Sequence, residues 1–175
     1  NFLHKIKRYA TKKNIVLIFD EVTSAFHNNL GGLHLTLDVK PDLAVFAKAM
    51  GNGYPISAII GKKDVMDCAQ DTFISSTMWT ERIGFTAGIA TIEKMEKYSV
   101  QKKLVEYGKK IKNIWIDASK DTGVNIKING LDSIPKFHFD YANRVELLTY
   151  FTQEMLEAGF LATGGTASTF AYTDE

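Results

Sequence analysis

The sequence predicts an α/β fold in the first part of the chain and an α+β unit in the second. In the first part, an amphipathic helical pattern leads into residues 15–19, an unbroken apolar run that ends at two acidic residues. A helix followed by a buried strand is typical of α/β domains. In the second part, apolar and polar residues alternate at 124–128 and 137–139, which is typical of half-buried strands. We therefore predict two domains, residues 1–98 and residues 99–175.

The elements of the first domain follow from its apolar pattern. Residues 2–13 carry apolar side chains on one side and lysines on the others, which predicts an amphipathic helix. Residues 15–19 favour a strand buried on both faces, as in a parallel sheet. Gly84 and Gly88 are small enough to let the last helix pack closely. Further elements are expected at 43–47 and 57–60 as strands, at 62–70 as a short helix and at 80–98 as a longer one.

The second domain opens with another helical pattern. Residues 100–120 predict a helix whose lysines lie on an exposed face. After the two alternating segments, Asn143 is expected to cap a helix that runs to Ala158, with Gly159 as its stop signal. One more strand is expected at the end. Strand, strand, helix and strand in this order form an α+β unit.

Composition excludes several classes of protein. The chain has 175 residues, of which 45% are hydrophobic and 23% charged, values that disfavour a disordered, collagen-like or coiled-coil protein. The formal net charge of +1 gives no bias toward nucleic acid or an anionic membrane. No apolar run approaches the roughly 18 residues of a membrane span. Cys68 has no internal disulfide partner, which favours a cytoplasmic location, and the four histidines show no metal-ligand spacing.

The informative cluster consists of Asp20, Lys48 and the glycines that follow Lys48. Both residues stand where an apolar strand ends, and in an open parallel sheet ligands bind at the carboxyl ends of the strands. A lysine on an apolar strand is partly desolvated, which favours its neutral, nucleophilic form. Pyridoxal 5'-phosphate (PLP) needs both side chains, a lysine for its aldehyde and an acid for its pyridinium nitrogen.

Simpler interpretations of the same residues stay open. Asp20 could only form a turn or cap a helix, and Lys48 could be a solvated lysine beside a glycine-rich loop. Gly51-Asn52-Gly53 could be a plain turn or part of a nucleotide-binding α/β domain. The nucleotide-binding interpretation is disfavoured because no Gly-x-Gly-x-x-Gly follows the strand.

Several motifs resemble one enzyme family. The Asp-Glu-Val segment, the Pro-Asp pair after it and the lysine segment keep the order and spacing seen in class III aminotransferases. Within that family the chain is most similar to glutamate-1-semialdehyde 2,1-aminomutase and its relatives. The resemblance covers essentially the whole chain. The segments that carry it are Ile18–Phe26, Pro41–Leu43, Ala47–Ala58, Ser75–Thr80, Leu156–Phe160 and Ala171–Glu175.

The resemblance implies a fold, a cofactor and four site residues. It implies the C-terminal part of a PLP-dependent transferase fold type I large domain, followed by a linker helix and a partial α+β small domain. PLP would be held by Lys48 through a Schiff base and by Asp20 at its pyridine nitrogen. Val22 would pack on the ring, and Thr77 would bind the phosphate held by the other subunit of a homodimer with shared active sites. Simple core packing for Val22 and helix capping for Thr77 remain the alternatives.

The resemblance also contains departures. The chain begins without an initiator Met or a signal pattern and lacks the family's phosphate loop, so we expect a truncated portion that binds PLP poorly and associates through uncovered apolar faces. Many members have Gly-Phe-Arg at Ala25-Phe26-His27, and aminomutases carry an active-site acid near Gly164-Gly165. We therefore expect an aminotransferase acting between an amino compound and a keto or aldehyde substrate. The alternatives are aminomutase activity or an inactive remnant that only folds and dimerises.

Overall fold

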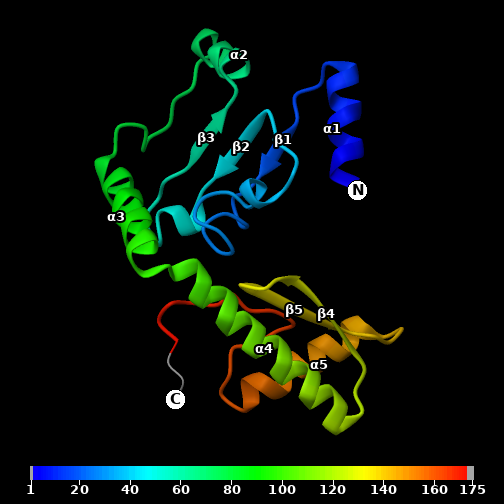
Figure 1. Ribbon diagram of the computed structural model, residues 1–175. Coiled ribbons are helices and arrows are strands. Elements are labelled where there is room, and N and C mark those ends of the chain that lie inside the picture. The colour runs from blue at the N-terminus through cyan, green and yellow to red at the C-terminus, as the bar shows by residue number, and fades with distance from the viewer. Residues whose placement is uncertain (1, 173–175) are drawn as a thin grey trace. The chain divides into compact units, whose positions relative to one another are not determined.

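A computed structural model describes residues 2–172 of the chain (Figure 1). The chain divides into two compact units, Asn1–Ser99 and Val100–Glu175. None of the helices within the described residues is long and apolar enough to cross a lipid bilayer. The last three residues of the motif Ala171–Glu175 lie outside the described residues.

A three-stranded sheet organises the first unit, in the order β1-β2-β3 (Figure 1). β1 and β2 are parallel, and β3 runs antiparallel to β2. The parallel pairing expected for residues 15–19 is present between β1 and β2, whereas β3 reverses direction. The physical reason is the short connection 47–57, because a parallel crossover needs about a dozen residues or more, usually with a helix. The strands are β1 (Ile18–Asp20), β2 (Leu43–Phe46) and β3 (Ala58–Gly61).

Burial of these strands is smaller than the apolar runs predicted. Ala44 and Phe46 of β2 are buried, but Ile18 of β1 is 53% exposed and Ile60 of β3 is 62% exposed. The prediction that residues 15–19 are buried on both faces is thus wrong within this unit. An apolar run shows which side chains gain from burial, whereas burial itself requires a second layer packed against the strand. The described residues of the unit leave these side chains uncovered.

The helices of the first unit begin and end close to the predicted positions. The longest, α3, is capped by Glu81, whose carboxylate accepts a hydrogen bond from the backbone N–H of Ile83 at 2.8 Å. The alternative in which Thr77 caps this helix is therefore wrong. The helices are α1 (Phe2–Lys13), α2 (Lys63–Met66) and α3 (Arg82–Tyr98), with 3₁₀ turns at Leu33–Thr36, Lys48–Met50 and Asp67–Asp71.

Close packing of α3 against the loop after Lys48 depends on Gly84. A methyl carbon added at Gly84 would lie 2.4 Å from the carbonyl oxygen of Pro55, which is backbone and cannot move aside alone. Gly84 is buried, as is Gly88 one turn later. The small residues that the sequence placed in this helix therefore set the position of the loop between β2 and β3.

We expect Gly84→Ala to lower the free energy of unfolding by about 1–3 kcal/mol, the usual cost of overpacking. Gly88→Ala is the matched control, since its added carbon would make an ordinary contact, 3.4 Å from Cδ1 of Ile56. Alanine is also the better helix former by about 1 kcal/mol. Chemical denaturation of both variants checks the prediction. Equal stability of Gly84→Ala and wild type would contradict the packing described.

Asp42 ties α1 to the sheet. Its Oδ1 accepts a hydrogen bond from Lys7 Nζ at 2.8 Å and pairs with Lys62 Nζ at 2.6 Å. Its Oδ2 accepts a hydrogen bond from the backbone N–H of Leu17 at 2.8 Å. The side chain is only 12% exposed. The hydrogen bonds from Lys62 and Lys7 hold the pKa of Asp42 well below its ordinary value.

Replacing Asp42 with asparagine is expected to lower the free energy of unfolding at pH 7 by about 2 kcal/mol, because charge-assisted hydrogen bonds are lost. Folding lowers the pKa of Asp42, so this stability is present above the unfolded-state pKa of 3.8. It is lost as the pH falls through that value toward the folded-state pKa. Denaturation should therefore show that the difference in free energy of unfolding between Asp42→Asn and wild type is smaller at pH 3 than at pH 7.

The control for this prediction is Asp67→Asn, which breaks an exposed pair with Lys63 within α2 and the turn after it. Exposed pairs of this kind contribute about 0–1 kcal/mol. If the difference in free energy of unfolding between Asp42→Asn and wild type were the same at pH 7 and pH 3, the lowered pKa of Asp42 would be contradicted.

The second unit packs two helices around a β-hairpin. Phe137 of β5 lies at its centre, in edge-to-face contact with Trp115 at 5.0 Å and Phe151 at 5.6 Å between ring centroids. Phe137 is buried, which places the core between the hairpin and the helices. The elements are α4 (Val100–Thr122), β4 (Ile126–Leu131), β5 (Ile134–Phe139) and α5 (Arg144–Glu157), with β4 and β5 antiparallel.

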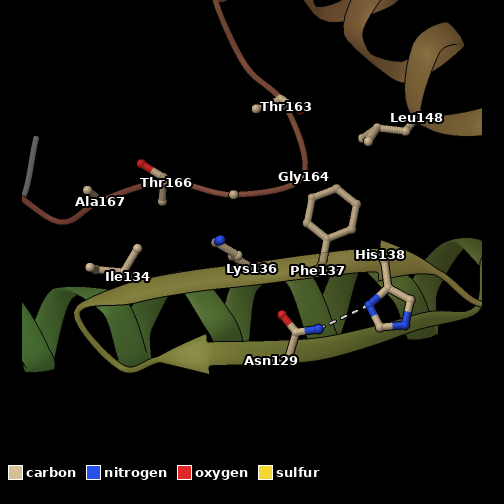
Figure 2. A pocket seen from close by; sticks show the side chains of 11 residues that line it. Asn129, Ile134, Lys136, Phe137, His138, Leu148, Thr163, Gly164, Thr166 and Ala167 are labelled. Carbon is tan, nitrogen blue, oxygen red and sulfur yellow. Dashed lines mark hydrogen bonds between the residues drawn. The ribbon is translucent and has the colours of Figure 1, made fainter. Parts of the chain in front are cut away.

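Two predictions in this unit need correction. Asn143 occupies the N-cap position of α5 as expected, but its side chain makes no capping hydrogen bond. The strand expected at the end is an extended segment with a single bridge, between Lys136 and Gly165. It runs beside β5 (Figure 2), joined by backbone hydrogen bonds such as Phe137 N–H to Gly164 O at 2.8 Å. Gly159 ends the helix with φ +88°, as predicted.

Candidate active site

Two of the residues predicted for the site lie at the same edge of the sheet. Asp20 is the last residue of β1 and is paired in register with Val45 of β2. Lys48 follows the end of β2 after a single residue, Ala47. Because β1 and β2 are parallel, their carboxyl ends meet at one edge. The backbone N–H of Glu21 continues the ladder with a hydrogen bond to Val45 O at 2.9 Å.

Lys48 leaves the strand in an uncommon backbone conformation. Its φ is +48°, in the left-handed region that few residues other than glycine adopt. Its carbonyl oxygen accepts hydrogen bonds from the N–H groups of Gly51 and Asn52, both at 3.1 Å, which closes the turn after it. Its ammonium donates a hydrogen bond to Thr23 Oγ1 at 2.7 Å. Strained backbone of this kind is concentrated at functional sites.

Asp20 is exposed, and the protein uses only one of its two carboxylate oxygens as a hydrogen-bond acceptor. Its Oδ1 accepts a hydrogen bond from the backbone N–H of Val22 at 3.0 Å. Within residues 2–172, Oδ2 has no hydrogen-bond partner, so it can accept one from a bound group. Val22 is half-buried directly beside this carboxylate. PLP requires two groups, a carboxylate with a free oxygen and an accessible amine. Asp20 provides the first, and Lys48 provides the second at the end of the neighbouring strand.

Glu21 fixes the loop that follows β1, a role that sequence reasoning missed. Its carboxylate is 3% exposed and accepts hydrogen bonds from the backbone N–H groups of Leu33 and His34, at 2.9 and 2.7 Å. Ser24 Oγ and His34 Nδ1 complete the set. Burial raises the pKa of Glu21, but the hydrogen bonds that it accepts outweigh burial and leave the pKa lowered. No sequence motif links Glu21 to the distant His34, so only the fold reveals this cluster.

His27 is a second residue that sequence reasoning did not assign to the site. Burial, followed by the positive charge of Lys48, lowers the pKa of His27. Its Nδ1 is buried and has no hydrogen-bond partner within the described part of the chain. The imidazole is therefore uncharged at neutral pH. The sequence thus places an uncharged ring near Lys48.

Thr77 is not brought to the other predicted residues. It lies in an exposed turn of the segment between the 3₁₀ turn at Asp67–Asp71 and α3. Among residues 2–172, no hydrogen bond joins Thr77 to Asp20 or Lys48. The same part of the chain contains no group of three or more His, Cys, Asp or Glu side chains that could hold a metal ion.

A separate groove of about 590 Å³ lies in the second unit, between β5, α5 and the extended segment beside β5 (Figure 2). None of the four predicted site residues lines it. Gly164 and Gly165 belong to its wall. A Cβ at Gly164 would lie 2.8 Å from the carbonyl oxygen of Phe137, so the backbone here is too close to β5 for a larger residue. The residues that line the groove are Asn129, Ile134, Lys136, Phe137, His138, Leu148, Thr163, Gly164, Gly165, Thr166 and Ala167.

Comparison with known proteins identifies the family. The family model for class III aminotransferases matches residues 1–170. The chain is 34% identical over 157 residues to 3-aminobutyryl-CoA aminotransferase of Cloacimonas acidaminovorans, covering 87% of this chain and 38% of the relative. It is 33% identical over 169 residues to glutamate-1-semialdehyde 2,1-aminomutase of Thermodesulfovibrio yellowstonii, covering 94% and 37%. The protein therefore belongs to the class III aminotransferases, a PLP-dependent family.

A solved structure shows the same fold. The FumI protein of Sphingopyxis sp. MTA144, determined with PLP, superposes with a TM-score of 0.86 at 22% identity, covering 95% of this chain and 40% of that one. The expected fold class, a part of the PLP-dependent transferase fold, is confirmed. The chain spans about two fifths of the length of these relatives.

Proposed function

We propose that this chain forms part of an enzyme that transfers an amino group between an amino compound and a keto or aldehyde substrate, with PLP as its cofactor. One observation carries the proposal. Asp20 and Lys48 lie at the carboxyl ends of two paired parallel strands, in a chain that belongs to the class III aminotransferases. Such an edge is where open α/β sheets bind their ligands.

Each predicted residue has a role in the proposal. When bound, PLP supplies an electron sink that lets a proton leave the substrate carbon. Lys48 would supply the amine that holds the cofactor through its aldehyde. Its free amine would carry the proton that leaves the substrate carbon. The free oxygen of Asp20 would accept a hydrogen bond from the pyridine N–H, and Val22 would pack on the ring.

The assembly and the domains belong to the same proposal. Residues 1–98 correspond to the C-terminal part of the large domain, and residues 99–175 to the linker helix and part of the small domain. The enzyme is proposed to be a homodimer in which Thr77 of one subunit binds the phosphate held by the other. Exposed apolar residues in the same segment, with Phe73 96% and Trp79 58% exposed, support a partner surface there. Lone Cys68 supports a cytoplasmic location.

Aminomutase activity is the second candidate, because one of the most similar relatives carries that name. An aminomutase moves an amino group within one molecule, whereas an aminotransferase moves it between two. We favour the aminotransferase, since the resemblance to the family implies an active-site acid near Gly164-Gly165 in aminomutases, and neither glycine here supplies one. The close approach of Gly164 to β5 also leaves no room for an acidic side chain.

Isotope transfer separates the two candidates. The complete reading frame that contains this chain is expressed, loaded with PLP and given a ¹⁵N-labelled amino donor together with an unlabelled keto acid. The aminotransferase proposal predicts ¹⁵N in the product of the keto acid. A second reaction contains only ¹⁵N-labelled glutamate-1-semialdehyde. Conversion of this compound to its isomer with ¹⁵N on the neighbouring carbon, without transfer to the keto acid in the first reaction, would support the aminomutase instead. Transfer of ¹⁵N to neither product would contradict both.

A further inference from the structure

Thr23 supplies the one hydrogen-bond partner of the Lys48 ammonium within the described residues. Oγ1 of Thr23 accepts this hydrogen bond at 2.7 Å. Thr23 belongs to the loop after β1, whereas Lys48 follows β2, so the contact joins the ends of the two parallel strands. Both side chains are exposed, so crowding does not force them together. The positions of the two backbones produce the contact.

Both backbones are held in place by further hydrogen bonds. On the Thr23 side, the N–H of Ala25 donates to the carbonyl oxygen of Glu21 at 3.0 Å, which closes a turn around Thr23. The buried carboxylate of Glu21 anchors that turn. On the other side, the left-handed φ of Lys48 sets the direction in which its side chain leaves the strand. The hydroxyl of Thr23 therefore lies at a fixed place relative to the Cα atom of Lys48.

We propose that Thr23 is a positioning residue, whose hydroxyl holds the Lys48 amine whenever that amine is not covalently bonded. The inference rests on the proposed function, in which the free amine acts twice, first as nucleophile and later as proton carrier. A lysine side chain has many rotamers. A hydrogen bond that selects one of them reduces the conformational entropy that the amine must lose each time it reacts. A threonine hydroxyl accepts a hydrogen bond from an ammonium without adding a charge.

The surroundings of Lys48 agree with this role. Burial and the positive charge of Lys48 lower the pKa of His27, so the ring of His27 is uncharged at neutral pH. No second cation from this loop therefore competes for the hydroxyl of Thr23. The hydroxyl also keeps its own proton, which it can donate to a bound group beside the amine.

Two substitutions of Thr23 test the proposal. Thr23→Val keeps the shape of the side chain but removes the hydroxyl, and Thr23→Ser keeps the hydroxyl. Thr11→Val, on the exposed surface of α1, is the matched control. Circular dichroism melts of all three variants establish that they fold. The first measurement needs no cofactor: ¹³C NMR of the lysine ε-carbons in the 175-residue chain, with the Lys48 signal assigned through Lys48→Gln.

We expect the Lys48 signal to move toward the position of a mobile lysine in Thr23→Val and to stay unchanged in Thr23→Ser and Thr11→Val. The second measurement is the rate at which PLP and borohydride label Lys48 in the complete protein, read by peptide mapping. Loss of one hydrogen bond should slow labelling about fivefold in Thr23→Val. An unchanged signal and an unchanged rate in that variant would overturn the positioning role. Failure of the wild type to label Lys48 would instead contradict the proposed function, and the NMR result would still decide the role of Thr23.

Discussion

Replacing Lys48 with alanine in the complete PLP-loaded enzyme is expected to reduce amino-group transfer by about 10³-fold or more. The variant loses both the nucleophile that condenses with the aldehyde and the group that carries the proton. The hydroxyl of Thr23 is the only hydrogen-bond partner of the Lys48 ammonium in the described part of the chain, and a hydroxyl cannot replace the amine in either role. Steady-state kinetics with a fixed amino donor and keto acid measures the effect.

The matched control is Lys40→Ala, since Lys40 is an exposed lysine a few residues before β2. Its turnover should stay close to that of wild type. Thermal unfolding of Lys48→Ala should also resemble wild type, because the side chain is exposed and contributes little packing. Retention of wild-type turnover by Lys48→Ala would remove Lys48 from the mechanism.

Replacing Asp20 with alanine is expected to lower turnover by about 10²- to 10³-fold while leaving Lys48 able to react with PLP. The variant loses the carboxylate that accepts a hydrogen bond from the pyridine N–H and keeps the ring protonated. In the protein, the only partner of this carboxylate among the described residues is the backbone N–H of Val22. The change therefore removes little that holds the fold together.

Two measurements on Asp20→Ala separate binding from turnover. Labelling of Lys48 by PLP and borohydride should persist, whereas kcat should fall. Asp121→Ala, at an exposed position near the end of α4, is the control and should leave both unchanged. Wild-type kcat in Asp20→Ala would show that another residue faces the pyridine nitrogen.

The part of the site that the sequence predicts is the part carried by local patterns. Asp20 and Lys48 each follow an apolar run, and the rule that parallel strands end at one edge of a sheet is enough to bring them together. Val22 lies beside Asp20 because it follows two positions later in the chain and its backbone N–H donates a hydrogen bond to the Asp20 carboxylate. The small residues of α3 predicted close packing, and Gly84 provides it against Pro55.

The rest of the site depends on contacts that no local pattern records. Glu21 binds His34 across thirteen positions of the chain, through a loop that has no regular periodicity. The contact between Thr23 and Lys48 requires the relative position of two loops and the left-handed backbone of Lys48. The direction of β3 and the exposure of Ile18 likewise depend on connections and covering layers, which hydrophobic periodicity does not describe.

The central claim is that Lys48 is the lysine that binds PLP, and reductive trapping tests it most directly. The complete protein is incubated with PLP, reduced with borohydride, digested and mapped by mass spectrometry. The account predicts the phosphopyridoxyl group on the peptide that contains Lys48. The label on another lysine, with Lys48 unmodified, would contradict it.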